Sequence, residues 1–235
     1  MSPVNIVEEA RERNLDILGV TDHNSTKHGP LIKRLAEKKG IFVLCGAEVT
    51  TKEETHCLTF FEDDEKLELF QQYLDAHLPD IPNKPGLFGY QVVVDEQGMI
   101  LEEMDRLLIS ALDQTIEQVR DKVHELGGIF IPAHIDRPSF SLISQLGFVP
   151  RDLGADAFEI SRHVSVKEIV SRFPYLEGKT FIGGSDAHFP GQVGSRKTMM
   201  LMHAASFEEI RLALKGEGGR AVMLEPSPGE WKGKK

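Results

Sequence analysis

The sequence is poor in the features that mark secreted and membrane proteins. Its 235 residues include one tryptophan and only two cysteines, Cys45 and Cys57. Two cysteines do not make the disulfide framework of a small secreted domain, so we expect both to be reduced thiols in the core. No apolar run reaches the roughly 18 residues that cross a bilayer, and no basic-then-apolar leader is visible. These absences predict a cytoplasmic globular protein without a membrane partner.

The chain also lacks a large basic tract. It carries 27 basic and 37 acidic side chains, which gives a formal net charge of −10. Proteins that hold duplex nucleic acid neutralise many phosphates at once, and this composition argues against that mode of binding. A few metal ions and two or three basic side chains are enough for a single phosphate. We therefore expect a small phosphorylated substrate, such as a nucleotide or short oligonucleotide, and no duplex nucleic acid.

Apolar runs alternate with amphipathic segments along most of the chain. Strand-like runs occupy 17–20, 41–47, 56–61, 129–131, 157–160, 180–183, 198–202 and 220–224; helical patterns occupy 3–14, 30–39, 65–77, 99–126 in two pieces, 166–172 and 207–215. Repeated strand–helix units predict an α/β fold with a mainly parallel sheet or barrel. We expect one domain over 1–235, a proline-punctuated insertion at about 78–105, and a frayed tail from residue 226.

Side chains that ligate metals accompany five of the strand-like runs. They are Asp22 and His23, Glu48, His56, His134, and Asp186 with His188. Because the C-terminal ends of parallel barrel strands meet on one face, we expect these groups to share a pocket there. Imidazole and carboxylate ligands suit zinc, manganese and iron(II). A lone histidine at a strand end is more often a packed or hydrogen-bonded residue than a ligand, but the joint placement of these groups favours a shared metal site.

Five motifs follow one another in a recognisable order. They are Thr-Asp-His-Asn (21–24), Gly-Ala-Glu-Val-Thr (46–50), His56, Ala-His (133–134) and Gly-Gly-Ser-Asp-Ala-His (183–188). This order resembles the PHP family, named for polymerase and histidinol phosphatase. The resemblance implies a distorted (β/α)7 TIM-like barrel, two or three divalent metal ions and hydrolysis of phosphate esters. Family members open with a strand ending in His-x-His, so the resemblance also implies that this first strand is absent here.

The resemblance implies how the ligands divide among metal positions. One position would use Glu48, His56 and His134. A second would share Glu48 and add Asp186, and a third would keep His23 and His188. The second and third positions would lack ligands from the absent segment. An open strand edge at that point makes self-association a possible outcome.

Three further assignments concern catalysis. Water bound to such ions ionises near neutral pH, so the hydroxide it supplies would attack phosphorus. Arg137, three residues after His134, is placed to reach a phosphate oxygen, although a surface arginine fits the pattern equally. Asp22 either orients a ligand or caps the next loop. His188 completes this set of candidate catalytic residues, alongside its expected role as a ligand.

Three functions compete on this sequence. The first is a metal-dependent hydrolase of phosphate esters that acts on a small phosphorylated metabolite or nucleotide. The second is a non-catalytic or regulatory PHP module, and the third is an unrelated metal-dependent amidohydrolase. The presence of every later ligand favours the first over the second, because a decayed site would lose several ligands at random. The third lacks the bridging lysine signal expected of it.

Overall fold

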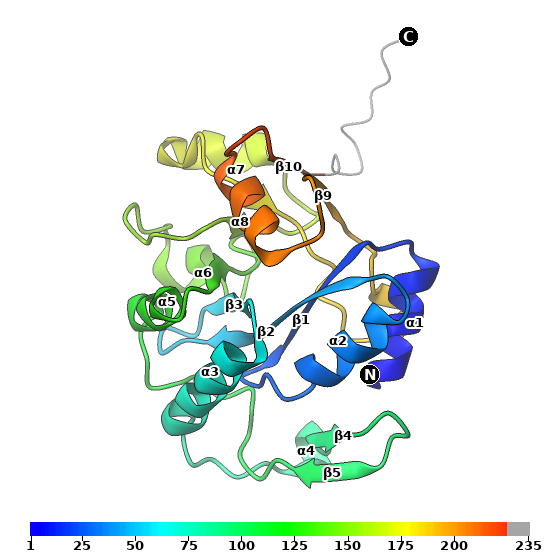
Figure 1. Cartoon of the computed structure of the whole chain (residues 1–235). Helices are drawn as coiled ribbons and strands as arrows, with labels where there is room; N and C mark the ends of the chain where they lie inside the picture. The colour runs from blue at the N-terminus through cyan, green and yellow to red at the C-terminus, as the bar shows by residue number, and fades with distance from the viewer. Residues whose placement is uncertain (225–235) are drawn as a thin grey trace.

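A four-stranded sheet forms the centre of the molecule (Figure 1). The computed structural model describes residues 1–224, so the tail expected to fray lies outside the described residues. The strands are β1 (Ile17–His23), β2 (Phe42–Thr50), β3 (His56–Phe61) and β6 (Ile129–Pro132), in the order β1-β2-β3-β6. Among the described strands, β1 and β6 are therefore the two edges of this sheet.

The lengths of two connections explain the directions of the first three strands. Helix α2 (Gly29–Glu37) crosses over between β1 and β2, which pair in parallel. Only residues 51–55 join β2 to β3, and these two strands are antiparallel. A parallel pair needs a crossover of roughly a dozen residues or more, so this link permits only a hairpin. β3 is also antiparallel to β6. The expectation of a mainly parallel sheet is thus wrong for β3.

The remaining strands form three separate pairs. These are β4 (Val92–Val94) with β5 (Ile100–Glu103), β7 (Phe158–Glu159) with β8 (Phe181–Ile182), and β9 (Thr198–Leu201) with β10 (Ala221–Leu224). Only the β7–β8 pair is parallel. The α/β class is confirmed. The strands within residues 1–224 do not pair into a closed ring, so the seven-unit barrel is not confirmed.

Helices pack on the central sheet and on the smaller strand pairs and bury apolar side chains. They are α1 (Pro3–Glu12), α3 (Asp64–His77), α5 (Ile116–Glu125), α6 (Leu142–Leu146), α7 (Val166–Arg172) and α8 (Phe207–Lys215), with one-turn 3₁₀ segments at Pro174–Leu176 and Pro190–Gln192. Ser2, Asp63 and Thr115 cap their helices by accepting backbone N–H groups. Cys45 and Cys57 are buried free thiols, as expected. Across residues 1–224 no helix has the length and apolar character to cross a membrane.

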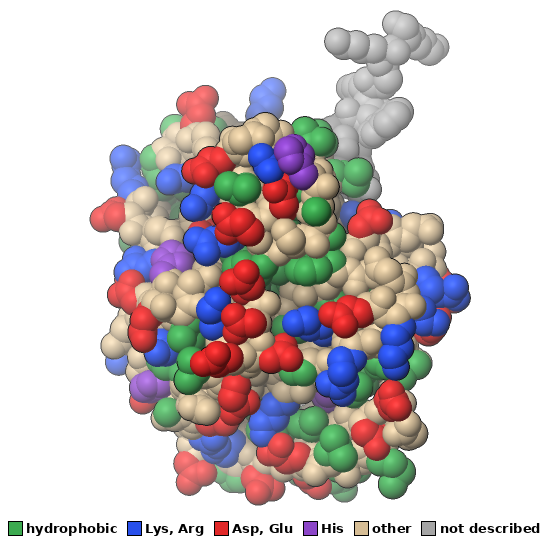
Figure 2. All heavy atoms as spheres, in the orientation of Figure 1, with side chains coloured by type: hydrophobic (Ala, Val, Ile, Leu, Met, Phe, Trp, Pro, Cys, Tyr) green, Lys and Arg blue, Asp and Glu red, His purple; other side chains and the backbone are tan. Residues whose placement is uncertain are grey.

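The segment expected to be an insertion contains a short helix, α4 (Pro85–Phe88), and the β4–β5 hairpin at the lower end of Figure 1. The helix predicted from residue 99 is therefore wrong in its first piece, because Ile100 pairs with Val94 across the hairpin. Apolar side chains gather over this end of the molecule (Figure 2). Lys27 pairs with Glu102 at 2.6 Å and ties the hairpin to the body.

Candidate metal centre

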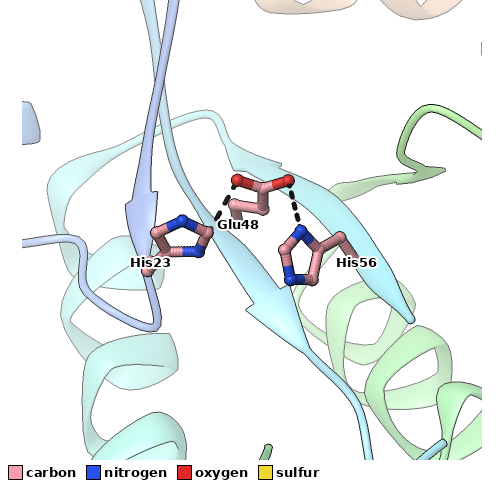
Figure 3. A group of neighbouring side chains, drawn as sticks. All are labelled: His23, Glu48 and His56. Carbon is pink, nitrogen blue, oxygen red and sulfur yellow. Dashed lines mark hydrogen bonds and ion pairs between the residues drawn. The ribbon is translucent and has the colours of Figure 1, made fainter. Parts of the chain in front are cut away.

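Three imidazoles surround one buried carboxylate at the end of the central sheet. His56 Nδ1 lies 3.0 Å and His134 Nε2 lies 3.3 Å from Glu48 Oε1. His23 Nδ1 lies 3.6 Å from the other oxygen, Oε2. Figure 3 shows His23 and His56 on either side of Glu48. Candidate ligand atoms of His23, Glu48 and His56 all lie within 4.8 Å of one another, which is the spacing of a shared ion.

Strand register brings these side chains to one face. His23 is the direct partner of Glu48 in the parallel β1–β2 pair. His56 pairs with Thr50, two residues beyond Glu48, so both side chains project from the same face of β2 and β3. His134 follows β6 with a backbone φ of +28°, a conformation that bulky residues rarely adopt. Such strain in a packed loop is typical of functional sites.

The charges in the cluster stabilise one another. Burial opposes ionisation of Glu48, but hydrogen bonds from His134 and His56 outweigh it and lower the pKa of the carboxyl. Burial disfavours the imidazolium of His134, yet its bond to Glu48 raises the pKa of this histidine above the usual value. Burial lowers the pKa of His23 despite the nearby Glu48 charge. Glu48 is therefore an anion that attracts cations.

The donor atoms fit a divalent metal ion. Nδ1 of His23 and Nδ1 of His134 are both buried without a hydrogen-bond partner. An unpaired buried polar atom is costly, and an ion beside Glu48 would use Nδ1 of His23 as a ligand. His134 faces Glu48 with its other ring nitrogen, Nε2, which would be its ligand atom there. Imidazoles and one carboxylate form a donor set that zinc, manganese and iron(II) accept. The residues present thus match the group that the sequence motifs imply.

Two of the predicted ligands lie on the loop after β8. The His188 ring is 6.1 Å from that of His23, and the side chain of His188 is largely exposed. Asp186 has a backbone φ of +44° and pairs with Arg137 at 2.5 Å. His23 thus lies between the Glu48 cluster and this loop. Arg137 pairs with a carboxylate of this loop and its side chain is 42% exposed, so it is a surface arginine that also lies beside a predicted ligand.

Asp22 lies beside the cluster and pairs with a different histidine. Its carboxylate is 3.1 Å from Nδ1 of His28, and it is half exposed. The other ring nitrogen, Nε2 of His28, accepts the backbone N–H of Val94 at 3.3 Å. His28 therefore connects the strand that carries His23 to the β4–β5 hairpin. No sequence motif predicted this link.

Glu159 was not among the predicted site residues, although the structure places it against His134. It lies at the end of β7, is buried, and accepts the backbone N–H of His134 at 3.0 Å. Burial raises the pKa of Glu159. One feature of the sequence could have identified Glu159: it is a carboxylate within the apolar run Ala-Phe-Glu-Ile (157–160). A charged residue in a buried strand needs a partner.

A cavity of about 730 Å³ opens next to the cluster. All of β1 contributes to its wall, and so do Glu48, Glu159, Asp186 and His188. Apolar residues of the central sheet also line it, among them Leu44, Phe60, Ile129 and Ile131. His23, Glu48, Asp186 and His188 thus stand at the wall of a space that a substrate could enter.

Comparison with known proteins agrees with the motifs. Residues 176–217 match the family model described as PHP-associated. The uncharacterized protein YqxK of Bacillus subtilis is 24% identical over 253 residues, which cover 96% of this chain and 59% of YqxK. MJ1587 of Methanocaldococcus jannaschii is 31% identical over 62 residues, or 26% of this chain and 36% of MJ1587.

Several solved structures share the fold. The lesion-specific endonuclease PfuEndoQ of Pyrococcus furiosus has a TM-score of 0.70 and 22% identity, covering 94% of this chain and 52% of that one. Endonuclease Q bound to a 27-mer duplex with an abasic lesion also has a TM-score of 0.70, with 21% identity and coverage of 95% and 53%. A protein of Bifidobacterium adolescentis, assigned as a metal-dependent phosphoesterase, has a TM-score of 0.54, 18% identity and 91% coverage of both chains.

The fold and the PHP-associated segment confirm the resemblance to the PHP family of metal-dependent phosphoesterases. The chain spans 59% of YqxK and about half of the two Endonuclease Q chains.

The expectation that duplex nucleic acid is excluded is wrong, since Endonuclease Q shares this fold and is solved on a duplex. The charge argument failed because net charge averages the whole surface, whereas a binding surface is local. Acidic and basic side chains are interspersed on the face in Figure 2.

Proposed function

We propose that this chain is a metal-dependent phosphoesterase that hydrolyses phosphodiester bonds in DNA. The observation that carries the proposal is the convergence of His23, His56 and His134 on the single carboxylate of Glu48. A site of this kind serves phosphoryl chemistry, because divalent ions neutralise charge on phosphate and activate water. The Endonuclease Q structures, with higher TM-scores than the phosphoesterase, favour DNA over a small metabolite.

The two oxygens of Glu48 suggest how more than one ion would be held. His56 and His134 approach Oε1, whereas His23 approaches Oε2. A carboxylate that shares its oxygens between two groups of histidines could hold two ions, which would neutralise charge on a phosphoryl group when bound. We assign manganese, zinc or iron as the ion, with two or three per site.

The remaining site residues have distinct roles in this proposal. Asp186 and His188 ligate from the loop after β8, and the His188 ring lies near that of His23. Arg137 binds a phosphate oxygen from its position beside Asp186. Asp22 supports the site through its contact with His28. Each of these side chains contributes orientation or charge rather than a covalent step.

The test is a hydrolysis assay on the 235-residue chain. Substrates are a 27-mer duplex with one abasic site, the undamaged duplex, the single strand and a panel of small phosphate monoesters, each with Mn²⁺ or Zn²⁺. We expect cleavage of the lesion-bearing duplex, abolished by EDTA and restored by the metal. Glu48→Gln should lower both bound metal and turnover, because it removes the central anion.

The matched control is Glu103→Gln, which changes an exposed glutamate on β5 and should leave both readouts unchanged. If the chain hydrolyses only monoesters, the substrate is a small metabolite rather than DNA. Metal binding that depends on Glu48, without turnover of any substrate, would favour the non-catalytic module. Equal metal content in the wild type and Glu48→Gln would contradict the metal centre itself.

A further inference from the structure

The loop that follows His134 presents an aromatic ring at the edge of the cluster. Phe140 stacks on the ring of His56, with 4.9 Å between centroids and 13° between planes. Phe140 is nevertheless 44% exposed to solvent. Phe140 therefore offers apolar aromatic surface to solvent immediately beside a candidate metal ligand.

This loop is held in place by hydrogen bonds from three directions. The backbone N–H of His56 donates to the carbonyl of Phe140 at 2.9 Å. Ser141 Oγ donates to the carbonyl of Arg137 at 2.7 Å, and Ser161 N–H donates to Asp136 at 2.6 Å. The exposed ring is thus part of a fixed platform rather than of a mobile loop.

The backbone of Phe140 is strained. Its φ is +53°, in the left-handed region that a bulky L-residue seldom occupies. The surrounding hydrogen bonds maintain this conformation, and strain maintained in this way is concentrated at ligand-binding sites. A glycine or asparagine would adopt the same backbone at lower cost. The sequence places a phenylalanine there instead, which points to a function for the ring.

The chemistry of the loop fits one nucleotide. Arg137 supplies a guanidinium for phosphate, and Phe140, three residues later, supplies an aromatic face. Every nucleobase has a π-face, so stacking on an exposed aromatic ring needs no particular sequence. We propose that Phe140 is the platform on which the nucleobase next to the bound phosphate stacks. This inference rests on the proposed function, since it names a subsite for the substrate of the same centre.

Binding can be measured without turnover, which separates this inference from the proposed activity. The probe is a single-stranded oligonucleotide with one 2-aminopurine, titrated with the 235-residue chain in EDTA. Stacking quenches 2-aminopurine fluorescence. We expect quenching by the wild type and by Phe140→Trp, and about five- to a hundredfold weaker binding with little quenching for Phe140→Leu. An oligonucleotide made of abasic spacers should bind the wild type and Phe140→Leu equally.

The matched control is Phe148→Leu, since Phe148 is a half-exposed phenylalanine that lines a different hollow with Arg151 and Tyr175. It should bind as the wild type does. A 2-aminopurine mononucleotide and a duplex with 2-aminopurine beside an abasic site identify the source of the base, free nucleotide or nucleic acid. Base-dependent binding in a chain that hydrolyses nothing would support the platform and contradict the proposed function.

Two results would overturn the inference. One is equal binding and equal quenching by the wild type, Phe140→Leu and Phe148→Leu. The other is a loss in Phe140→Leu that is as large on abasic spacers as on the base-bearing strand, together with reduced uptake of Mn²⁺. That second pattern would show that Phe140 acts only by supporting His56.

Discussion

The carboxylate of Glu159 accepts the backbone N–H of His134 at 3.0 Å, although Glu159 ends β7 and His134 follows β6, a strand of a different sheet. The carbonyl of Glu159 also accepts the N–H of Ile135 at 2.9 Å. Together these bonds hold the strained backbone of His134, whose side chain reaches Glu48. Glu159 thus fixes the position of a candidate ligand, and within residues 1–224 no hydrogen bond joins it to Glu48.

The first prediction compares two substitutions of Glu159. Glu159→Ala leaves the N–H of His134 without an acceptor in a buried site, which should cost roughly 1–3 kcal/mol of unfolding free energy. Glu159→Gln keeps an oxygen that can accept the same bond, so its loss should be within about 1 kcal/mol. Urea denaturation of the metal-free proteins measures both values. Equal losses of unfolding free energy in the two variants would mean that Glu159 does not stabilise the protein through this hydrogen bond.

The second prediction concerns pH. Burial raises the pKa of Glu159 above the ordinary 4.5, so the folded state retains a proton that the unfolded state has lost. The stability that Glu159 contributes is complete below 4.5 and is lost as the pH rises through the raised folded value. Glu159→Gln has no such proton. In EDTA, the unfolding free energy of the wild type minus that of Glu159→Gln should therefore fall as the pH rises from 4.5 to 8, and a constant difference would contradict the assignment.

The third prediction uses the glycine beside Glu159. A Cβ added at Gly184 would lie 2.6 Å from Oε1 of Glu159, in a place where the carboxylate is already fixed by His134. Gly184→Ala should therefore destabilise the protein by roughly 1–3 kcal/mol and lower its affinity for Mn²⁺. Gly191→Ala, where a Cβ meets nothing within 4 Å, is the control and should stay within about 0.5 kcal/mol. Thermal unfolding and metal titration give the two readouts.

The fourth prediction tests the link between the site and the hairpin. His28 contacts Asp22 and accepts the N–H of Val94, so His28→Ala should release the β4–β5 hairpin from the body. Cleavage after Glu96 by a glutamate-specific protease should then become several-fold faster, since the turn opens more often. His163→Ala, at an exposed position far along the chain, is the control. Unchanged cleavage in His28→Ala would show that Lys27 and Glu102 are sufficient to hold the hairpin.

The sequence was enough to locate most of the elements and the candidate ligands. Helix α7 and helix α8 have the bounds that their apolar periodicity predicted, and β3 matches its predicted range. These segments were readable because periodicity and capping are local properties. His23 and Glu48 were recognised in the same way, as polar residues that interrupt or end apolar runs.

Only the tertiary structure decided how those elements pair. The antiparallel β2–β3 hairpin and the β5 strand, where a helix was expected, depend on connections and partners that local propensity does not record. The same holds for Glu159 and Phe140, whose positions against His134 and His56 arise from segments 25 and 84 residues away along the chain. Contacts at such separations depend on packing rather than on sequence pattern. The sequence therefore determined which side chains could bind a metal, and the fold decided which of them meet and what holds them there.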